Sequence, residues 1–425
     1  MEVKEASARY SRATGYKQTE MGMIPEDWEA RSIGSAIDLL TGFPFPSSGY
    51  SKTGVRLLRG SNVKRGVTDW SDDGTEYWPA ITSEIRKYIL KAGDVVIAMD
   101  GSLVGRSFAM LSHSDVPALL LQRVARIRSE FIAQNYLKAW ICSQRFTEHC
   151  DAVKTVTAIP HISPADIKSF KIALPPTKAE QEAIAEALSD ADVLIESLAQ
   201  LLAKKRHLKQ GAMQQLLTGK KRLSGFSGEW EVKRLGDLGP FLKGSGVRKD
   251  ECLSGDLPCI RYGEIYTKHS DYIKVFYSWI SPEVAATAKR LKQGDLLFAG
   301  SGETKEEIGK CVAFVDDIDA YAGGDIVILR PENSNPIFLG YYLNTAPINK
   351  QKASKGQGDA VVHISSTALS NIEITIPETN EQTAIATILS DMDAELAALE
   401  AKLAKARNLK QGMMQELLTG RIRLV

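Results

Sequence analysis

The segment 302–310, GETKEEIGK, has the glycines and the lysine with which a phosphate-binding loop holds a nucleotide. In such a loop four residues separate the two glycines, and a Ser or Thr after the lysine binds magnesium. Here six residues separate Gly302 from Gly309, and Cys311 follows Lys310. The spacing therefore argues against nucleotide binding.

A second segment, Asn335-Pro336-Ile337-Phe338, is similar to the Asn-Pro-Pro-aromatic motif with which amino-methyltransferases hold a flipped base. It lacks the second proline, and no glycine-rich adenosylmethionine loop precedes it. Proline is common at the first position of a helix. The motif therefore favours a helix start over a methyl-transfer site.

Histidines, cysteines and serines show no catalytic or metal-binding spacing. The six histidines are scattered, no two of the five cysteines form a Cys-x-x-Cys pair, and no Gly-x-Ser-x-Gly elbow or nuclease-like carboxylate cluster occurs. We therefore expect a non-catalytic chain that holds no metal and acts by binding. The odd number of cysteines fits a reducing cytoplasm, where we expect the protein to be located.

The composition is that of an ordinary globular protein of two or three domains. The chain has 425 residues, of which 44% are hydrophobic and 25% charged, with 53 Lys and Arg against 52 Asp and Glu. No run of 18 apolar residues occurs, so we expect no membrane span. Because the net charge is only +1, any contact with DNA must come from local patches.

The chain is a tandem duplication. LKQGAMQQLLTGKKRL at 208–223 returns as LKQGMMQELLTGRIRL at 409–424, with twelve of sixteen positions identical. The same offset of 201 relates EQEAIAEALSDAD at 180–192 to EQTAIATILSDMD at 381–393. Between these repeated ends the two halves differ almost everywhere. Repeated ends with different middles predict one scaffold that carries two different surfaces.

Each repeated end predicts a helix of about 40 residues, roughly 60 Å long, that pairs with the other. The apolar positions alternate in steps of four and three, which is the spacing of a coiled-coil seam. The expected seam comprises Ile184, Leu188, Ile195, Leu198, Leu202, Ile385, Leu389, Leu396, Leu399 and Leu403. The alternative, in which each helix packs only on its own domain, remains open.

Charge predicts how the helices pair. Residues 178–196 have a net charge of −5 and 197–222 of +7, while 378–400 have −6 and 401–425 have +5. Antiparallel pairing places each acidic half beside a basic half, and parallel pairing places like charges together. The alternative is that acidic residues near the N-terminus and basic residues near the C-terminus of each helix only complement the helix dipole. This explains the charges in the outer turns but not those farther along the helix. We therefore expect an antiparallel coiled coil.

The middles are expected to be mixed α/β domains. Strands are predicted at 95–99, 125–129, 170–175, 296–300, 326–330 and 372–377, and short helices at 131–144 and 337–346. The fold class is therefore α+β, with two globular domains separated by two long helices and an internal pseudo-two-fold repeat. The expected boundaries are an N-terminal tail at 1–18, a first domain at 19–177, a first helix at 178–222, a second domain at 223–377 and a second helix at 378–425.

Three loop segments in each middle combine glycine, polar side chains and bases that can bind phosphates and base edges. They are 57–66, 99–106 and 154–161 in the first middle, and 259–269, 299–310 and 352–363 in the second. His161 and His363 lie at equivalent positions, which suggests a part in the shared scaffold as much as in DNA contact. The candidate DNA-binding residues are Arg59, Asn62, Lys64, Arg65, Arg106, Lys154, Thr155, Thr157, His161, Arg261, Tyr262, Lys268, Lys305, Lys310, Lys352, Lys355, Gln357 and His363.

These motifs closely resemble the specificity subunits of type I restriction–modification enzymes. The resemblance rests on IPEDW (24–28), LPPTKAEQEAIAEALSDAD (174–192) and the doubled LKQG-x-MQ-x-LLTG, and covers 19–425. It implies two target-recognition domains that read the unlike halves of a split, non-palindromic DNA sequence, with the coiled coil setting the gap. The stretch before Thr19 is longer than this family leads us to expect.

The resemblance also implies partners. These are double-stranded DNA, two modification (methyltransferase) subunits that use adenosylmethionine, and restriction subunits that use ATP and magnesium, while this chain binds no cofactor itself. Two other interpretations stay open on the residues alone: a self-contained DNA methyltransferase or nuclease, and a protein scaffold unrelated to DNA, which the near-neutral charge favours.

Overall fold

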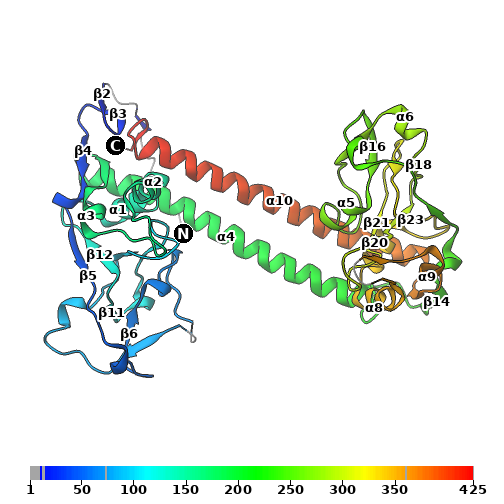
Figure 1. Ribbon diagram of the computed structural model, residues 1–425, viewed down its shortest axis with the longest axis horizontal. Helices are drawn as coiled ribbons and strands as arrows, with labels where there is room; N and C mark the ends of the chain where they lie inside the picture. Colours follow the sequence, from blue (N-terminus) through cyan, green and yellow to red (C-terminus); the bar gives the residue numbers. More distant parts are fainter. Residues whose placement is uncertain (1–9, 12–14, 72–73, 359–360, 425) are drawn as a thin grey trace. The chain divides into compact units, whose positions relative to one another are not determined.

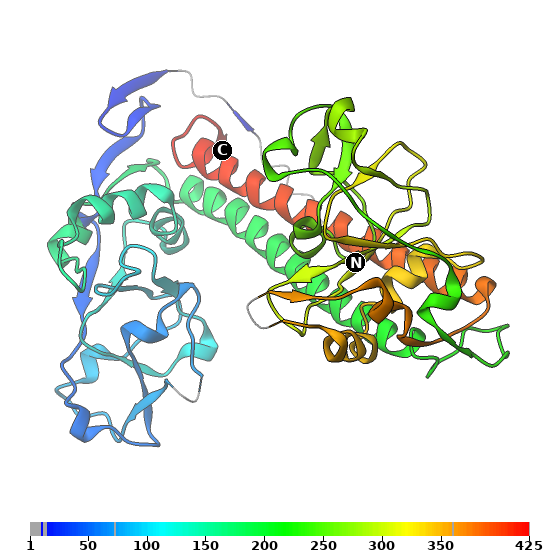
Figure 2. The ribbon, with the colours of Figure 1, turned by 45° about the vertical axis from the view of Figure 1, so that its right-hand side comes forward.

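The computed structural model describes residues 10–11, 15–71, 74–358 and 361–424. The chain divides into two compact units: unit 1 is Met1–Ala199 with Lys402–Val425, and unit 2 is Gln200–Ala401. Each unit holds the globular middle of one repeat together with part of each long helix (Figure 1, Figure 2). The two long helices therefore belong to both units.

The long helices are α4 (Lys178–Leu216) and α10 (Thr379–Leu417), each of 39 residues. Thr177 caps the start of α4, because its Oγ1 accepts the backbone N–H of Glu180 at 3.3 Å. Beyond the helix ends, Gly219 and Gly420 have φ angles of +68° and +71°, the left-handed conformation in which glycine commonly ends a helix. The two long helices predicted from the sequence are confirmed.

Ion pairs show the direction of pairing inside each unit. In unit 1, Lys410 on α10 lies 2.5 Å from Asp192 on α4. In unit 2 the pairs are Lys209–Asp393 at 2.5 Å, Lys205–Glu395 at 2.6 Å and Arg206–Glu400 at 2.6 Å. Acidic segments face basic segments, and from Lys205 to Lys209 on α4 the partner on α10 moves back from Glu395 to Asp393. The helices are therefore antiparallel within each unit, as the charge pattern predicts.

Burial along the helices changes from their domain-bound ends to their middles. Ile184 and Leu188 in unit 1 and Ile385 and Leu389 in unit 2 are at most 3% exposed, because the globular domains also cover them. The other predicted seam residues are buried or half-buried: Ile195, Leu198, Leu202, Leu396, Leu399 and Leu403. Where the helices have only each other as a partner, the seam is less completely covered.

Unit 1 contains a five-stranded sheet of order β5-β12-β9-β10-β7, a three-stranded sheet of order β11-β6-β8 and the pair β13-β4. The strands are β4 Glu29–Ser32, β5 Asp38–Thr41, β6 Val55–Leu58, β7 Arg65–Gly66, β8 Glu76–Trp78, β9 Val95–Ala98, β10 Phe108–Met110, β11 Ala118–Leu120, β12 Val124–Arg128 and β13 Lys171–Leu174. The helices are α1 Gln134–Ile141, α2 Gln144–Val153 and α3 Pro164–Ser169. The core cluster of Trp28 and Trp140 also includes Ile184 and Leu417, so the domain and the helix ends share one core.

Unit 2 contains two four-stranded sheets, β15-β23-β19-β21 and β17-β16-β22-β18, and the pairs β14-β25 and β20-β24. The strands are β14 Glu231–Arg234, β15 Phe241–Lys243, β16 Leu257–Ile260, β17 Ser278–Ile280, β18 Lys289–Arg290, β19 Leu296–Ala299, β20 Ser301–Gly302, β21 Cys311–Ala313, β22 Tyr321–Ala322, β23 Ile326–Leu329, β24 Val362–His363 and β25 Glu373–Ile376. The helices are α5 Tyr262–Thr267, α6 Pro282–Ala285, α7 Pro336–Tyr342, α8 Ala346–Lys355 and α9 Ser366–Ser370.

The predicted mixed α/β middles are confirmed. The six predicted strands correspond to β9, β12, β13, β19, β23 and β25, and the two predicted short helices to α1 and α7. Before β9 and β19, the repeated Gly-Asp turn has the same role in both units: Asp94 and Asp295, at most 2% exposed, accept the backbone N–H groups of Lys91 and Lys292 at 2.8 Å. A shared turn thus begins the central strand of each domain.

The N-terminal residues are partly built into unit 1. Strand β1 (Tyr10–Ser11) pairs with β26 (Arg423–Leu424), and β2 (Tyr16–Thr19) forms a hairpin with β3 (Gly22–Pro25). Tyr16 donates its hydroxyl to the carbonyl of Arg421 at 3.3 Å. Strand β2 thus crosses the predicted boundary between the tail and the first domain.

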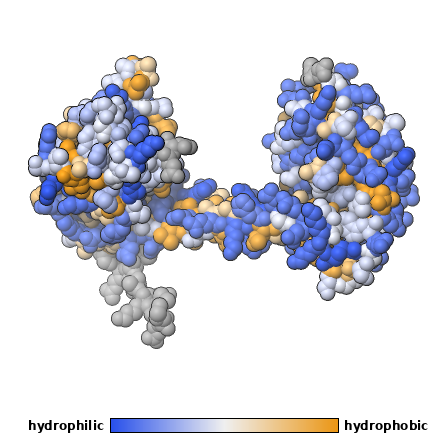
Figure 3. Space-filling model, turned by 90° about the horizontal axis from the view of Figure 1, so that it is seen from below, coloured by the Kyte–Doolittle hydropathy of each residue, from blue (hydrophilic) through white to orange (hydrophobic). Residues whose placement is uncertain are grey.

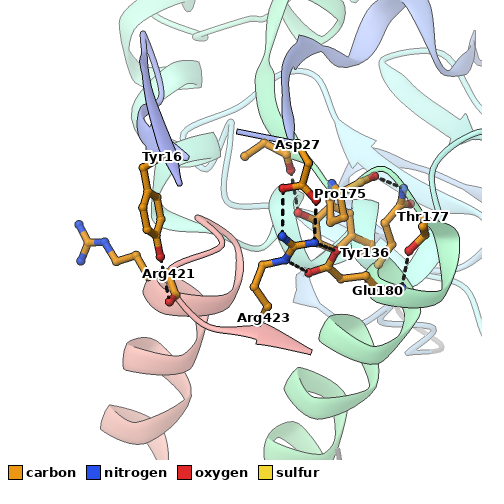
Figure 4. Close-up of polar contacts among 10 residues, drawn as sticks. Tyr16, Asp27, Tyr136, Pro175, Thr177, Glu180, Arg421 and Arg423 are labelled. Atoms are coloured by element: carbon orange, nitrogen blue, oxygen red, sulfur yellow. Dashed lines mark hydrogen bonds and ion pairs between the residues drawn. The ribbon is translucent and has the colours of Figure 1, made fainter. Parts of the chain in front are cut away.

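Arg423 closes unit 1 by binding two carboxylates, one near the N-terminus of the chain and one at the start of α4 (Figure 4). Its guanidinium donates to Glu180 at 2.5 and 2.7 Å and to Asp27 at 3.0 Å, and it lies 5.7 Å from the ring centre of Trp28. The hydrogen bond with Glu180, opposed by burial, raises the pKa of Arg423 above its ordinary value. The equivalent pair in unit 2 is Arg222 with Glu381 at 2.6 Å.

Replacement of Arg423 with Met should destabilise unit 1 by about 3–5 kcal/mol, because Glu180 would remain as a buried charge without its cation. The measurement is urea unfolding of the full chain. The matched control is Arg421→Met, whose side chain is 62% exposed and whose loss should change stability by less than about 0.5 kcal/mol. Equal effects of the two variants would show that the Arg423 pair is not what closes the unit.

Candidate nucleic-acid interface

In unit 1 the three predicted loop segments meet on one surface. Asp100 and His161 pair as an isolated β-bridge, and the N–H of Gly101 is donated to the carbonyl of Pro160 at 3.0 Å. The segment that contains Lys64 joins them through strands β7 and β10, which pair in parallel. The fold therefore gathers loops that are up to a hundred residues apart in the sequence.

Two candidate bases on this surface share one carboxylate. Arg106 donates to both oxygens of Asp151, at 3.1 and 2.6 Å, and Lys154 donates to the same carboxylate at 2.6 Å. The hydrogen bonds from Arg106 and then Lys154 hold the pKa of Asp151 well below its usual value. Because Asp151 stays ionised, it offsets part of the positive charge of its two partners.

Asn62 does not belong to the exposed surface. Its side chain is 3% exposed; it accepts the N–H of Arg59 at 3.0 Å and donates to the carbonyl of Asp69 at 2.9 Å. These bonds hold the turn between β6 and β7 and use the Asn62 side chain inside the fold, so its contact with DNA stays a prediction that its burial does not support. By contrast, Lys64 and Arg65 are exposed directly after that turn.

In unit 2 the three predicted segments surround a cavity of about 920 Å³. Tyr262 and Tyr266 come from α5, Gly302 and Lys310 from the segment after β19, and Val361 from the segment before β24. His363 pairs with Ser301 between β20 and β24, and its Nδ1 lies 2.9 Å from the Ser301 hydroxyl. The second domain therefore also gathers its predicted loops at one place.

Two lysines of unit 2 use their ammonium groups inside the domain. Lys352 is 1% exposed and donates to the carbonyls of Gly309 and Leu343 at 2.7 and 2.9 Å; burial lowers its pKa to about 8. The Lys352 ammonium thus serves the interior of the domain, and its contact with DNA stays a prediction that its burial does not support. Lys310 is half-buried, and its strongest bond is to the carbonyl of His269 at 2.7 Å. Burial lowers its pKa as well.

The remaining candidates divide by exposure. Exposed residues are Lys64, Arg65, Thr155, Thr157 and His161 in unit 1, and Tyr262, Lys268, Lys305, Gln357 and His363 in unit 2. Half-buried residues are Arg59, Arg106, Lys154, Arg261, Lys310 and Lys355. His161 and His363 both pair with the segment after the central strand, so they occupy the same place in the scaffold. Their contact with DNA stays a prediction.

Sequence reasoning passed over residues that the structure places on these surfaces. Glu303, Glu306 and Glu307 line the unit 2 cavity, and carboxylates can accept the amino group of cytosine. In unit 1, Arg123 has a φ of +67°, is 65% exposed and lies 2.9 Å from Asp100. The sequence search considered basic and amide side chains and therefore left out glutamates that could contact bases. Arg123 was missed because no motif in the sequence around it indicates that it reaches this surface.

The two segments with possible catalytic character have structural roles. Asn335 caps α7, because its Oδ1 accepts the N–H of Phe338 at 3.0 Å. Cys311 is buried in β21, and burial raises the pKa of its thiol to about 12. Within the described ranges, no three His, Cys, Asp or Glu side chains group as metal ligands, and no helix is long and apolar enough to cross a membrane.

Both repeats match one protein family. The family described as "Type I restriction modification DNA specificity domain" matches residues 25–204 and 227–406. The EcoAI type I restriction enzyme specificity subunit of Escherichia coli is 34% identical over 179 residues, which cover 41% of this chain and 29% of that protein. The MjaVIII specificity subunit of Methanocaldococcus jannaschii is 33% identical over 215 residues, which cover 49% of each chain. The matches span at most about half the length of these relatives.

A solved structure has a similar fold. The S subunit of a type I restriction–modification system from M. genitalium superposes with a TM-score of 0.59 at 17% identity, covering 92% of this chain and 96% of that one. At this identity the likeness concerns the fold alone.

Proposed function

This chain belongs to the family of type I restriction–modification DNA specificity domains, and we propose that it is the subunit that gives such an enzyme its DNA sequence specificity. The observation that carries the proposal is the double match to a DNA specificity domain, once in each unit, over middles that differ in sequence. Two unlike readers recognise two unlike half-sites. The target is then a split and non-palindromic sequence of double-stranded DNA.

The proposal assigns chemistry to partner subunits. This chain supplies binding surfaces and holds no cofactor, while modification subunits use adenosylmethionine and restriction subunits use ATP and magnesium. The roles of Asn335 and Cys311 support a non-catalytic chain. Asn335 caps a helix and Cys311 is buried in a strand, so both segments that resemble catalytic motifs have a structural role. A complex that acts on chromosomal DNA of a bacterium or archaeon works in the cytoplasm.

Replacement of both Lys64 and Arg65 with Ala removes two exposed bases from the unit 1 surface. The affinity for DNA should fall, and the slope of log K against log salt should become shallower by up to about 1.8, since each phosphate contact contributes about 0.9. The measurement is fluorescence anisotropy with the chain and its modification partner, on DNA selected from a random pool.

The selection itself tests the split target. It should return two short, unlike motifs with a constant gap. The control variant Arg421→Ala removes an exposed base far along the chain from the loops and should bind as the wild type does. A single uninterrupted motif, or none, would contradict the proposal.

We also propose that α4 and α10 set the gap between the half-sites. The support is the antiparallel pairing, in which ion pairs hold the register of both helices. A helix rises about 1.5 Å per residue, and B-DNA about 3.4 Å per base pair. Helix length then translates directly into spacer length.

Insertion of one heptad into each helix, after Ala199 and after Ala401, should lengthen the spacer by about three base pairs, because seven residues add roughly 10 Å. The heptad keeps the apolar seam in phase. Mapping of selected motifs measures the spacer. An unchanged spacer with retained binding, or a change in either half-site, would contradict this role of the helices.

A repeated surface on the helices fits two copies of one partner. Leu208 on α4 and Leu409 on α10 are equivalent by the repeat and are 51% and 60% exposed. Nearby Gln210 and Gln411 are also identical and exposed. Figure 3 shows hydrophobic residues among hydrophilic ones along the helical segments. Packing inside the chain does not require exposed residues to be the same in both repeats. A partner that binds once to each repeat does require the same residues at both sites. We propose that each unit binds one modification subunit here.

Leu208→Asp and Leu409→Asp should each reduce the number of bound modification subunits from two to one, and the double variant should bind none. A charge at an apolar contact is costly to desolvate. Native mass spectrometry counts the copies. Leu253→Asp, at a position 78% exposed outside the helices, is the control and should keep both. Two bound copies in the double variant would contradict the site.

A further inference from the structure

Each DNA-facing surface has an exposed aliphatic side chain at the same place in the scaffold. Ile159 in unit 1 and Val361 in unit 2 lie two residues before His161 and His363, and are 60% and 51% exposed. Although the middles differ in most positions, an exposed β-branched side chain recurs here. Val156 is also fully exposed, but its counterpart by this alignment is Gly358, so it does not recur.

The segment around Ile159 is held by its own hydrogen bonds. Thr157 donates its hydroxyl to the carbonyl of Ile159 at 2.7 Å, and the Pro160 carbonyl accepts the N–H of Gly101 at 3.0 Å. Thr155 accepts the N–H of His161 at 3.0 Å. The aliphatic side chain is therefore presented from a short bonded loop rather than folded into a core.

The described residues on both sides of 359–360 are also constrained by backbone contacts. Gln357 and His363 exchange backbone hydrogen bonds at 2.9 and 2.8 Å. Gly358 has a φ of +109°, and a Cβ there would lie 2.1 Å from the carbonyl oxygen of Val361. Only glycine fits this tight approach. Val361 also lines the unit 2 cavity beside the exposed Tyr262.

Polar groups surround both aliphatic side chains. Thr155, Thr157 and His161 are exposed beside Ile159, and Gln357 and His363 beside Val361. Such groups can bind phosphates and base edges. An aliphatic side chain among them is suited to a different contact, the stacked face between two base pairs, where many DNA-bending proteins insert an apolar wedge.

We propose that Ile159 and Val361 are wedge residues, each of which inserts between neighbouring base pairs of its own half-site and unstacks them. This inference rests on the proposed DNA-specificity function and adds to it a distortion of the target. A modification subunit must take its target base out of the stack, and an already opened step lowers the energy this needs. The two units then act on their half-sites independently.

The test uses the chain with its modification subunits and DNA in which 2-aminopurine replaces each half-site purine in turn, because unstacking increases 2-aminopurine fluorescence. Besides the base that the modification subunit takes out of the stack, the wild-type complex should increase the fluorescence at one further step in each half-site, and this further increase is the one that the variants test. Ile159→Ser should abolish the increase only in the half-site of unit 1, and Val361→Ser only in that of unit 2. Ile159→Val should retain it, and Val156→Ser, the matched control in the same loop, should leave it unchanged.

Anisotropy binding measured on the same samples separates the two levels of inference. If the wild type binds no split site, the proposed function fails. If the Ser variants bind the split site and keep the full fluorescence increase, the wedge is wrong and the proposed function stands. If uracil in place of thymine weakens DNA binding by the wild type but not by the Ser variants, the two side chains contact thymine methyl groups. That result also contradicts the wedge.

Discussion

Reciprocal ion pairs between α4 and α10 favour the antiparallel direction in which the two long helices pair, and the attachment of both domains follows from that direction. Lys410 with Asp192 in unit 1 and Lys209 with Asp393 in unit 2 are the same pair in the two repeats, each at 2.5 Å. One exposed pair contributes little, but several that act in the same direction favour one orientation. An antiparallel orientation places the end of each repeat against the domain of the other.

The repeated sequences therefore serve attachment, and the divergent middles carry the surfaces that we propose recognise DNA. Gln181 and Gln382 show how: their side-chain carbonyls accept the N–H groups of Ala133 and Asn335 at 2.8 and 2.9 Å, which joins each long helix to the short helix of its own domain. Arg423 and Arg222 then join each domain to the end of the other repeat. The side chains in these contacts are repeated residues, and the middles contribute backbone N–H groups, so the loop sequences can vary without loosening the scaffold.

The near-neutral net charge of the chain has a local counterpart, because the surfaces proposed to bind DNA carry charges of both signs. Asp151 holds Arg106 and Lys154, and acidic side chains line the unit 2 cavity, so these surfaces mix signs. Such a surface gives less non-specific attraction to phosphate than an all-basic one would. Specificity then depends more on base edges, and on the shape of the target, than on total charge.

The duplication, the two long helices, their antiparallel direction and the main strands can be predicted from the residues alone, because periodicity, repeated motifs and charge are local or can be compared directly along the chain. Which loop residues face outward becomes apparent only in the folded chain. Asn62 and Lys352 have the residue types of DNA readers, yet both are buried because their polar groups satisfy nearby backbone groups. Arg123 and the cavity-lining glutamates reach the surfaces through contacts distant in sequence. Burial depends on long-range packing, which the local residue pattern does not contain.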